Sequence, residues 1–146
     1  MQPIEGCKFG LLAPPELKDN GALAGITYID TFGYGHLRVL IQTGVIDAAT
    51  SAAPLLQHCD TTDGTYAAIT NAALADALAD GEDDQLHAID VDLTTGSTKR
   101  YIKCLMTAGN GTTGTYACIL GILSRKLTDD HDGLKTDSGL DELVSV

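Results

Sequence analysis

The sequence has no tryptophan, only 5% aromatic residues, and only 9 Lys and Arg against 20 Asp and Glu in 146 residues. The net charge of -11 argues against binding a nucleic-acid backbone, which requires clustered cations. It also disfavours an anionic membrane surface. No run approaches the roughly 18 apolar residues of a transmembrane helix, and no signal peptide opens the chain. We therefore expect cytoplasmic synthesis, with neither nucleic acid nor membrane as a partner.

The sequence also lacks the motifs of common catalytic and metal sites. It has no G-x-S-x-G nucleophile elbow, and Cys7, Cys59, Cys104 and Cys118 include no pair at C-x2-C spacing. Residues 109–114 match G-x-G-x-x-G in letters, but a dinucleotide site needs a helix after the motif, and here a β-branched, apolar segment follows. We predict no catalytic residue, no cofactor and no metal ion. A zinc site built from distant residues is the weaker alternative.

A pair of cysteines and two acidic segments can each be interpreted either as ordinary structural features or as functional ones. Cys104 and Cys118 lie on segments that we expect to be neighbouring strands, so a disulfide is conceivable, although free cysteines in a core are favoured. The acidic groups at 80–84 and 129–132 do not match the spacing of a calcium loop. We interpret them as solvated acidic segments.

What the chain does contain is a series of short strand patterns separated by turn residues. In the stretch 29–47, Leu37, Val39 and Ile41 alternate as on one buried strand face, and Lys99–Ala108 is its expected partner. Segment 70–85 predicts a loop with at most two helical turns. The apolar run at 115–123 predicts a central strand buried on both faces. The predicted strands are Ile26–Thr31, His36–Thr43, Pro54–Asp60, Thr65–Ile69, Leu86–Leu93, Lys99–Thr107 and Thr115–Leu123.

This pattern predicts an all-β fold, an antiparallel β-sandwich or jelly roll of about seven or eight strands. We place the sandwich domain at 25–125. Residues 1–24 are predicted to be an extended N-terminal arm, since their prolines oppose a regular helix or central strand, and its apolar residues suggest docking on its own domain or a neighbour. Residues 126–146 are predicted to be an acidic C-terminal tail. A core rich in small residues favours oligomerisation.

Three stretches together resemble a known family. They are Ile29–Asp47, then residues 56–66 with the turn Asp63-Gly64, and then Lys99–Lys103 followed by a Gly/Thr hairpin and an apolar strand. In this order and spacing they resemble small tailed-bacteriophage virion proteins encoded near the major capsid protein. The two late-strand cysteines and the longer acidic tail depart from the family.

The resemblance implies a capsid decoration (cement) protein without catalytic residues, located on the capsid exterior and often trimeric. We accordingly expect a structural virion protein that binds the major capsid protein across capsomer junctions. The alternatives are a carbohydrate-binding module for host surfaces, for which aromatic side chains are few, and another head or tail component. The predicted interface residues, from the arm and the tail, are Phe9, Leu11, Leu12, Leu140 and Leu143.

Overall fold

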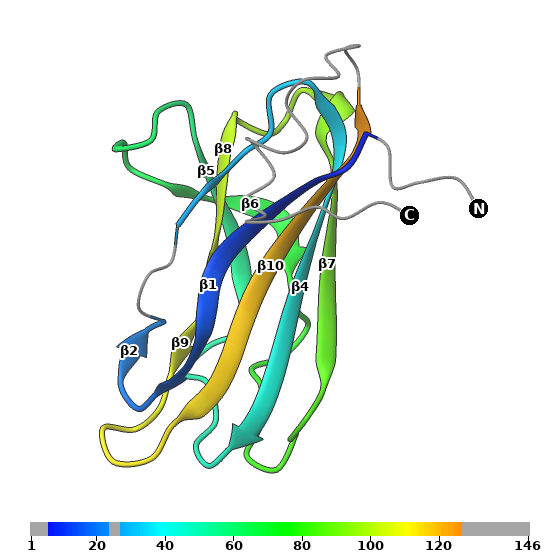
Figure 1. Cartoon of the computed structure of the whole chain (residues 1–146). Helices are drawn as coiled ribbons and strands as arrows, with labels where there is room; N and C mark the ends of the chain where they lie inside the picture. The colour runs from blue at the N-terminus through cyan, green and yellow to red at the C-terminus, as the bar shows by residue number, and fades with distance from the viewer. Residues whose placement is uncertain (1–5, 24–26, 127–146) are drawn as a thin grey trace, which may run out of the picture.

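The computed structural model describes residues 6–23 and 27–126, which form two antiparallel four-stranded sheets and a small two-stranded one (Figure 1). The first sheet has the strand order β1-β10-β4-β7, and the second has β3-β8-β5-β6. This confirms the predicted all-β antiparallel sandwich, with ten strands in the described residues. The elements are β1 (Lys8–Lys18), β2 (Gly21–Ala22), β3 (Ile29–Asp30), β4 (Tyr34–Ile46), β5 (Leu55–Cys59), β6 (Ala67–Ala73), β7 (Leu86–Asp92), the 3-10 turn η1 (Leu93–Thr95), β8 (Tyr101–Leu105), β9 (Thr107–Ala108) and β10 (Thr115–Lys126).

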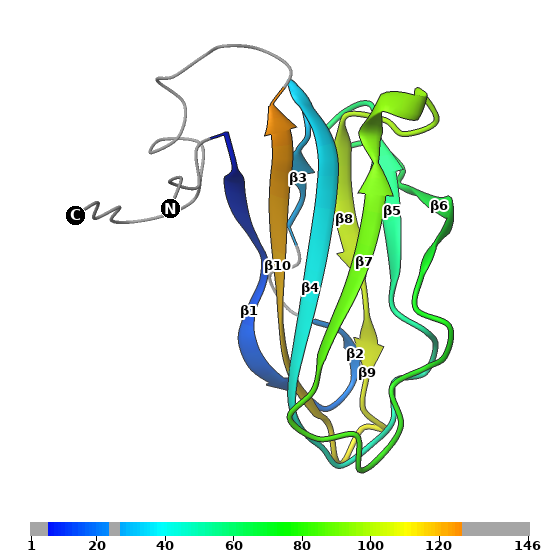
Figure 2. The ribbon, with the colours of Figure 1, turned by 90° about the vertical axis from the view of Figure 1, so that its right-hand side faces the viewer.

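The core lies between the two sheets, which Figure 2 shows side by side as two layers. Alternate residues of each strand point into it, as strand geometry requires. Leu37, Val39 and Ile41 of β4 are fully buried there, as their alternation predicted. From the second sheet, Leu56 and Ile102 meet them. The other large, fully buried apolar side chains are Leu12, Ile46, Met106, Ile119 and Leu123.

Ile29 joins the two sheets at a place where the first sheet has no side chains. Gly10 of β1 and Gly121 of β10 are direct cross-strand partners. A Cβ added at either glycine would lie 2.8 Å or 3.0 Å, respectively, from the Cδ1 atom of Ile29. The two glycines therefore leave a depression that the Ile29 side chain fills.

The predicted partner of the 29–47 stretch is correct for only one part of it. Ile29 pairs with Ile102 of β8, but β4 pairs with β10 and β7 in the other sheet. The chain changes sheets at Gly33, whose φ of 83° is readily accessible only to glycine. The expected partner Lys99–Ala108 is therefore wrong for β4.

Part of the predicted N-terminal arm belongs to the sandwich. Residues 8–18 form β1, an edge strand paired with β10. Pro14 and Pro15 are tolerated because the strand has one free edge and because the register shifts between Ala13 and Glu16. Leu12 and Ala13 of this segment pack into the core of their own domain, whereas Leu11 and Leu17 are exposed. The predicted tail beyond Lys126 lies outside the described residues.

Two other predictions need correction. Within 70–85 the described chain contains no helix: β6 continues to Ala73 and bends and turns follow. β10 is central in its sheet, but only one of its faces is fully buried, because inward Ile119 and Leu123 alternate with half-exposed Leu120 and Ile122. Within residues 6–23 and 27–126, no third layer covers the second face.

Candidate protein-interaction face

The outward face of the first sheet carries many apolar side chains, with polar Gln42, Arg38 and Asp90 among them. Cross-strand register places Leu11 of β1, Leu120 of β10, Leu40 of β4 and Ala88 of β7 in one row across the sheet. All four are exposed or half-buried, so the row points away from the core. We call the complete set the outer apolar face: Phe9, Leu11, Leu17, Leu40, Leu86, Ala88, Tyr116, Cys118, Leu120 and Ile122.

This face differs from the usual solvated side of an antiparallel sheet, on which polar residues alternate with buried apolar ones. Leu86 is 64% exposed, Leu11 51% and Tyr116 50%. Groups of exposed apolar side chains on one face mark protein or ligand contacts more often than single exposed leucines do. The exposed apolar side chains make this face a candidate contact surface.

A charged group bounds the face near the end of β7. Arg38 donates two hydrogen bonds to the carboxylate of Asp90, at 2.8 and 2.9 Å, and His36 Nε2 lies 3.2 Å from the same carboxylate. The hydrogen bond from Arg38 lowers the pKa of Asp90. Arg125 and Asp92 form a looser pair at 3.8 Å beside them. An apolar centre with a polar margin is the usual composition of a protein interface.

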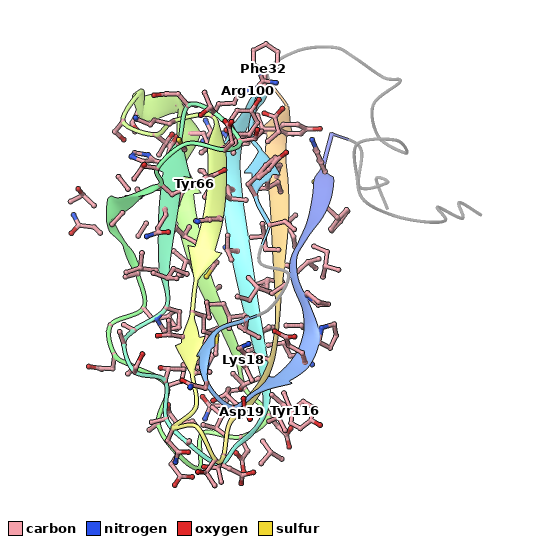
Figure 3. The ribbon with its side chains drawn as sticks, turned by 90° about the vertical axis from the view of Figure 1, so that its left-hand side faces the viewer. Lys18, Asp19, Phe32, Tyr66, Arg100 and Tyr116 are labelled. Atoms are coloured by element: carbon pink, nitrogen blue, oxygen red, sulfur yellow. The ribbon has the colours of Figure 1, made fainter. Side chains whose placement is uncertain are left out.

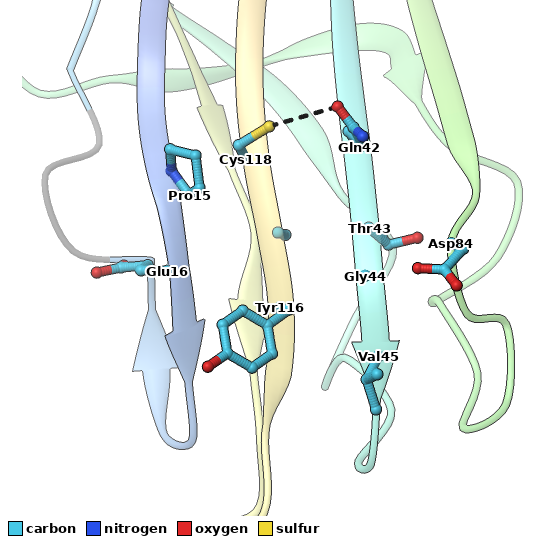
Figure 4. A pocket seen from close by; sticks show the side chains of 10 residues that line it. Pro15, Glu16, Gln42, Thr43, Gly44, Val45, Asp84, Tyr116 and Cys118 are labelled. Carbon is cyan, nitrogen blue, oxygen red and sulfur yellow. Dashed lines mark hydrogen bonds between the residues drawn. The ribbon is translucent and has the colours of Figure 1, made fainter.

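The opposite end of the face contains an open hollow of about 410 Å³ (Figure 4). Tyr116 and Pro15 form one side of it, and Val45 and Asp84 lie on the other side. Above it, the Cys118 thiol lies 4.0 Å from Gln42 Oε1. Such a hollow suits one anchoring side chain of a protein partner, because anchors placed in pockets supply much of an interface's binding energy.

The structure divides the predicted interface residues into three groups. Phe9 and Leu11 lie on the outer apolar face, opposite Ile122 and Leu120. Leu12 is 0% exposed and belongs to the core of its own chain, so it is not available to a partner in this fold. Leu140 and Leu143 lie outside the described residues.

Sequence reasoning missed the contributions of β4, β7 and β10 to this face. A usable signal was present in the apolar run at 115–123. A strand that is apolar on both faces needs cover on both, either from a further layer or from a partner.

The four cysteines lie apart on different segments of the fold and are free thiols. Cys104 in β8 and Cys118 in β10 belong to different sheets, which corrects the expectation of neighbouring strands. Burial raises the pKa of the Cys104 thiol to about 12. Among residues 6–23 and 27–126, no three or more His, Cys, Asp or Glu side chains are grouped to hold a metal ion. The same residues contain no helix of membrane-spanning length and hydrophobicity.

No protein family matches the chain, and no curated protein does. Among solved structures, the chain is similar to a protein in the structure of infectious bursal disease virus Gx strain, with 17% identity and a TM-score of 0.48. The match covers 88% of this chain but 34% of that one, so the chain spans about a third of its neighbour's length. A likeness of this degree carries no functional argument.

Proposed function

We propose that the chain is a structural virion protein that decorates the outside of a tailed-bacteriophage capsid and stabilises it by binding the major capsid protein across capsomer junctions. The observation that carries the proposal is the outer apolar face, whose large side chains no other described residue covers. The resemblance of three sequence stretches to decoration proteins supplies the identity of the partner. The proposal requires neither catalysis nor a cofactor.

Burial of the face gives the binding energy. Fully burying an exposed leucine stabilises a complex by about 1.5–3 kcal/mol, so covering a half-exposed one contributes on the order of 1 kcal/mol. Association costs roughly 4–15 kcal/mol in lost freedom of motion, so several such side chains are needed together. The outer apolar face supplies them on one surface. A protein that binds only the mature shell shifts the equilibrium toward that shell by mass action.

A homotrimer is part of the proposal. Phe9 and Leu11 bring the apolar face to the free edge of β1, where a neighbouring copy can continue the contact. The net charge of -11 opposes nonspecific association of free copies, so a specific trimer needs apolar burial of this kind. Sedimentation velocity of the full chain should give the trimer mass.

Co-sedimentation with purified capsids tests the proposal. We expect saturable binding of the full chain with many copies per particle. Leu86→Glu and Leu11→Glu place a carboxylate on the outer apolar face at exposed positions of the edge strands β7 and β1. Each should weaken binding by at least about tenfold, because a partner would bury an unpaired charge.

The matched control is Thr70→Glu, an exposed position on β6, an edge strand of the other sheet. It should bind capsids as the unmodified chain does. A chain that stays monomeric and never sediments with capsids contradicts the proposal. Full binding by both outer-face variants contradicts the role given to this face.

A further inference from the structure

The second sheet carries a separate cluster of aromatic and cationic side chains on its outer face and upper end. Of the five tyrosines and two phenylalanines in the chain, four lie here: Tyr28, Phe32, Tyr66 and Tyr101. The rings of Tyr28 and Tyr101 meet edge to face with centroids 5.3 Å apart. Phe32 is 72% exposed and Tyr28 43%. With Arg100 and Lys103 they form what we call the aromatic–cation cluster.

Aromatic rings and a carboxylate hold the two cations in place. The Arg100 guanidinium donates two hydrogen bonds to Asp30, at 2.8 and 2.7 Å, and lies 5.0 Å from the Phe32 ring centroid and 5.1 Å from that of Tyr101. Lys103 Nζ lies 4.3 Å from the Tyr66 ring centroid. Lys103 has no carboxylate partner among the described residues. Its ammonium group is therefore oriented but not neutralised.

The same surface presents hydrogen-bonding side chains that no other described residue engages. Gln57 is the cross-strand neighbour of Lys103, on the same face of the sheet. Its side-chain amide and the hydroxyls of Tyr28 and Tyr101 make no hydrogen bond to another described residue. The exposed rings of Phe32 and Tyr28, two tyrosine hydroxyls, an amide and an oriented ammonium thus occur together. Figure 3 shows Phe32, Arg100 and Tyr66 at the end of the molecule opposite Tyr116.

We propose that the aromatic–cation cluster binds an acidic glycan, a sugar chain whose residues carry carboxylates. The apolar C–H faces of sugar rings pack on exposed aromatic rings, and sugar hydroxyls exchange hydrogen bonds with tyrosine and amide groups. Lys103 pairs with the sugar carboxylate in a charge-assisted contact.

An acidic peptide fits the cluster less well. Extended peptides are commonly bound by pairing with a free sheet edge. β8, which carries Tyr101 and Lys103, lies between β3 and β5 in its sheet and is not an edge strand. Recognition here therefore depends on ring faces and side chains, which favours the glycan. This inference is independent of the proposed capsid contact, because the two surfaces are the outer faces of opposite sheets.

The test is binding of the full chain to immobilised oligogalacturonate, with its methyl-esterified form and polyglutamate as comparison probes. Phe32→Ala removes the most exposed ring, and Lys103→Met removes the charge while keeping a long stem. Each should weaken oligogalacturonate binding by about tenfold. Tyr116→Ala, at a half-exposed aromatic position on the opposite sheet, should bind oligogalacturonate unchanged. Salt should weaken binding, because the charge contact is screened.

Each alternative outcome overturns the proposal. Absence of oligogalacturonate binding refutes it, as does equal binding of the neutral ester, which removes the role of Lys103. Equal or tighter binding of polyglutamate would assign the cluster to acidic peptides. Unchanged binding by both cluster variants would place any glycan site elsewhere.

Discussion

Truncation of Ile29 should cost more stability than truncation of an average core isoleucine. The side chain is 3% exposed and lies over Gly10 and Gly121, which have no side chains to move into a vacated space. Isoleucine-to-alanine changes in cores cost about 2–5 kcal/mol, with larger values where the site cannot collapse. We therefore expect Ile29→Ala to lower the free energy of unfolding by about 4 kcal/mol. That is a large share of the roughly 5–15 kcal/mol that stabilises most domains.

Urea unfolding monitored by far-ultraviolet circular dichroism measures this loss, with the slope m checked for constancy between variants. Ile69→Ala is the matched control, because Ile69 is only partly buried at the margin of the core. It should lose clearly less stability. A loss below about 2 kcal/mol for Ile29→Ala would refute the reasoning, since the site would then collapse as well as an ordinary one.

A double-mutant cycle tests the same close packing by adding an atom at Gly121 instead of only removing atoms from Ile29. Gly121→Ala places a Cβ 3.0 Å from Ile29 Cδ1 and should cost about 1–3 kcal/mol by overpacking. Ile29→Val removes the Cδ1 atom and alone should cost about 1 kcal/mol. The double variant should lose less than the sum, because valine relieves the new contact. Strict additivity would show that the two positions do not compete for one space.

Three further predictions follow from other parts of the structure. The Arg100 guanidinium holds the pKa of Asp30 below its usual range, so the pair stabilises the fold above the ordinary Asp pKa of about 3.9, and this stability is lost as pH falls through the lower pKa of the folded state. Asp30→Asn should therefore reduce the dependence of the melting temperature on pH in acid. An unchanged dependence would show that this pair does not cause it. At neutral pH, iodoacetamide should label half-buried Cys118 in the native chain but not Cys104, because the Cys104 thiol is buried and stays protonated. Peptide mass mapping measures the labelling of each thiol, and equal labelling of the two would contradict the burial of Cys104. Tyr116→Ala should weaken capsid binding by about tenfold while changing the free energy of unfolding by less than about 0.5 kcal/mol. Full capsid binding by this variant would show that the hollow takes no part in the interface.

Local sequence pattern predicted the strands whose two faces differ in polarity. Val91 and Ile89 alternate with Asp90 and Asp92 in β7, and the structure buries the first pair and exposes the second. Such alternation reports the direction of each side chain directly, because strand geometry has a period of two. The sandwich fold could therefore be predicted from many such segments.

Strand pairing and layer number could not be predicted in the same way. Whether β4 joins the first or the second sheet depends on contacts between residues far apart in sequence, and the glycine at position 33 does not by itself decide between them. In β1, the prolines correctly excluded a central strand, but only the pairing with β10 shows that the segment is an edge strand.

The outer apolar face could not be predicted from local sequence pattern either. The apolar run of β10 was interpreted as a strand buried on both faces, whereas the residues on one of its faces are half-exposed in the structure. Sequence pattern reports that a side chain is apolar. It does not report whether the surface that covers it belongs to the same chain.

The most direct test of the central claim is an image reconstruction, at side-chain resolution, of phage capsids that carry this protein. The proposal predicts density for the sandwich on the outer surface of the shell, with Leu11, Leu86 and Tyr116 covered by the major capsid protein or by a neighbouring copy. A reconstruction in which the outer apolar face is open to solvent, or in which the sandwich is absent from the shell, would contradict it.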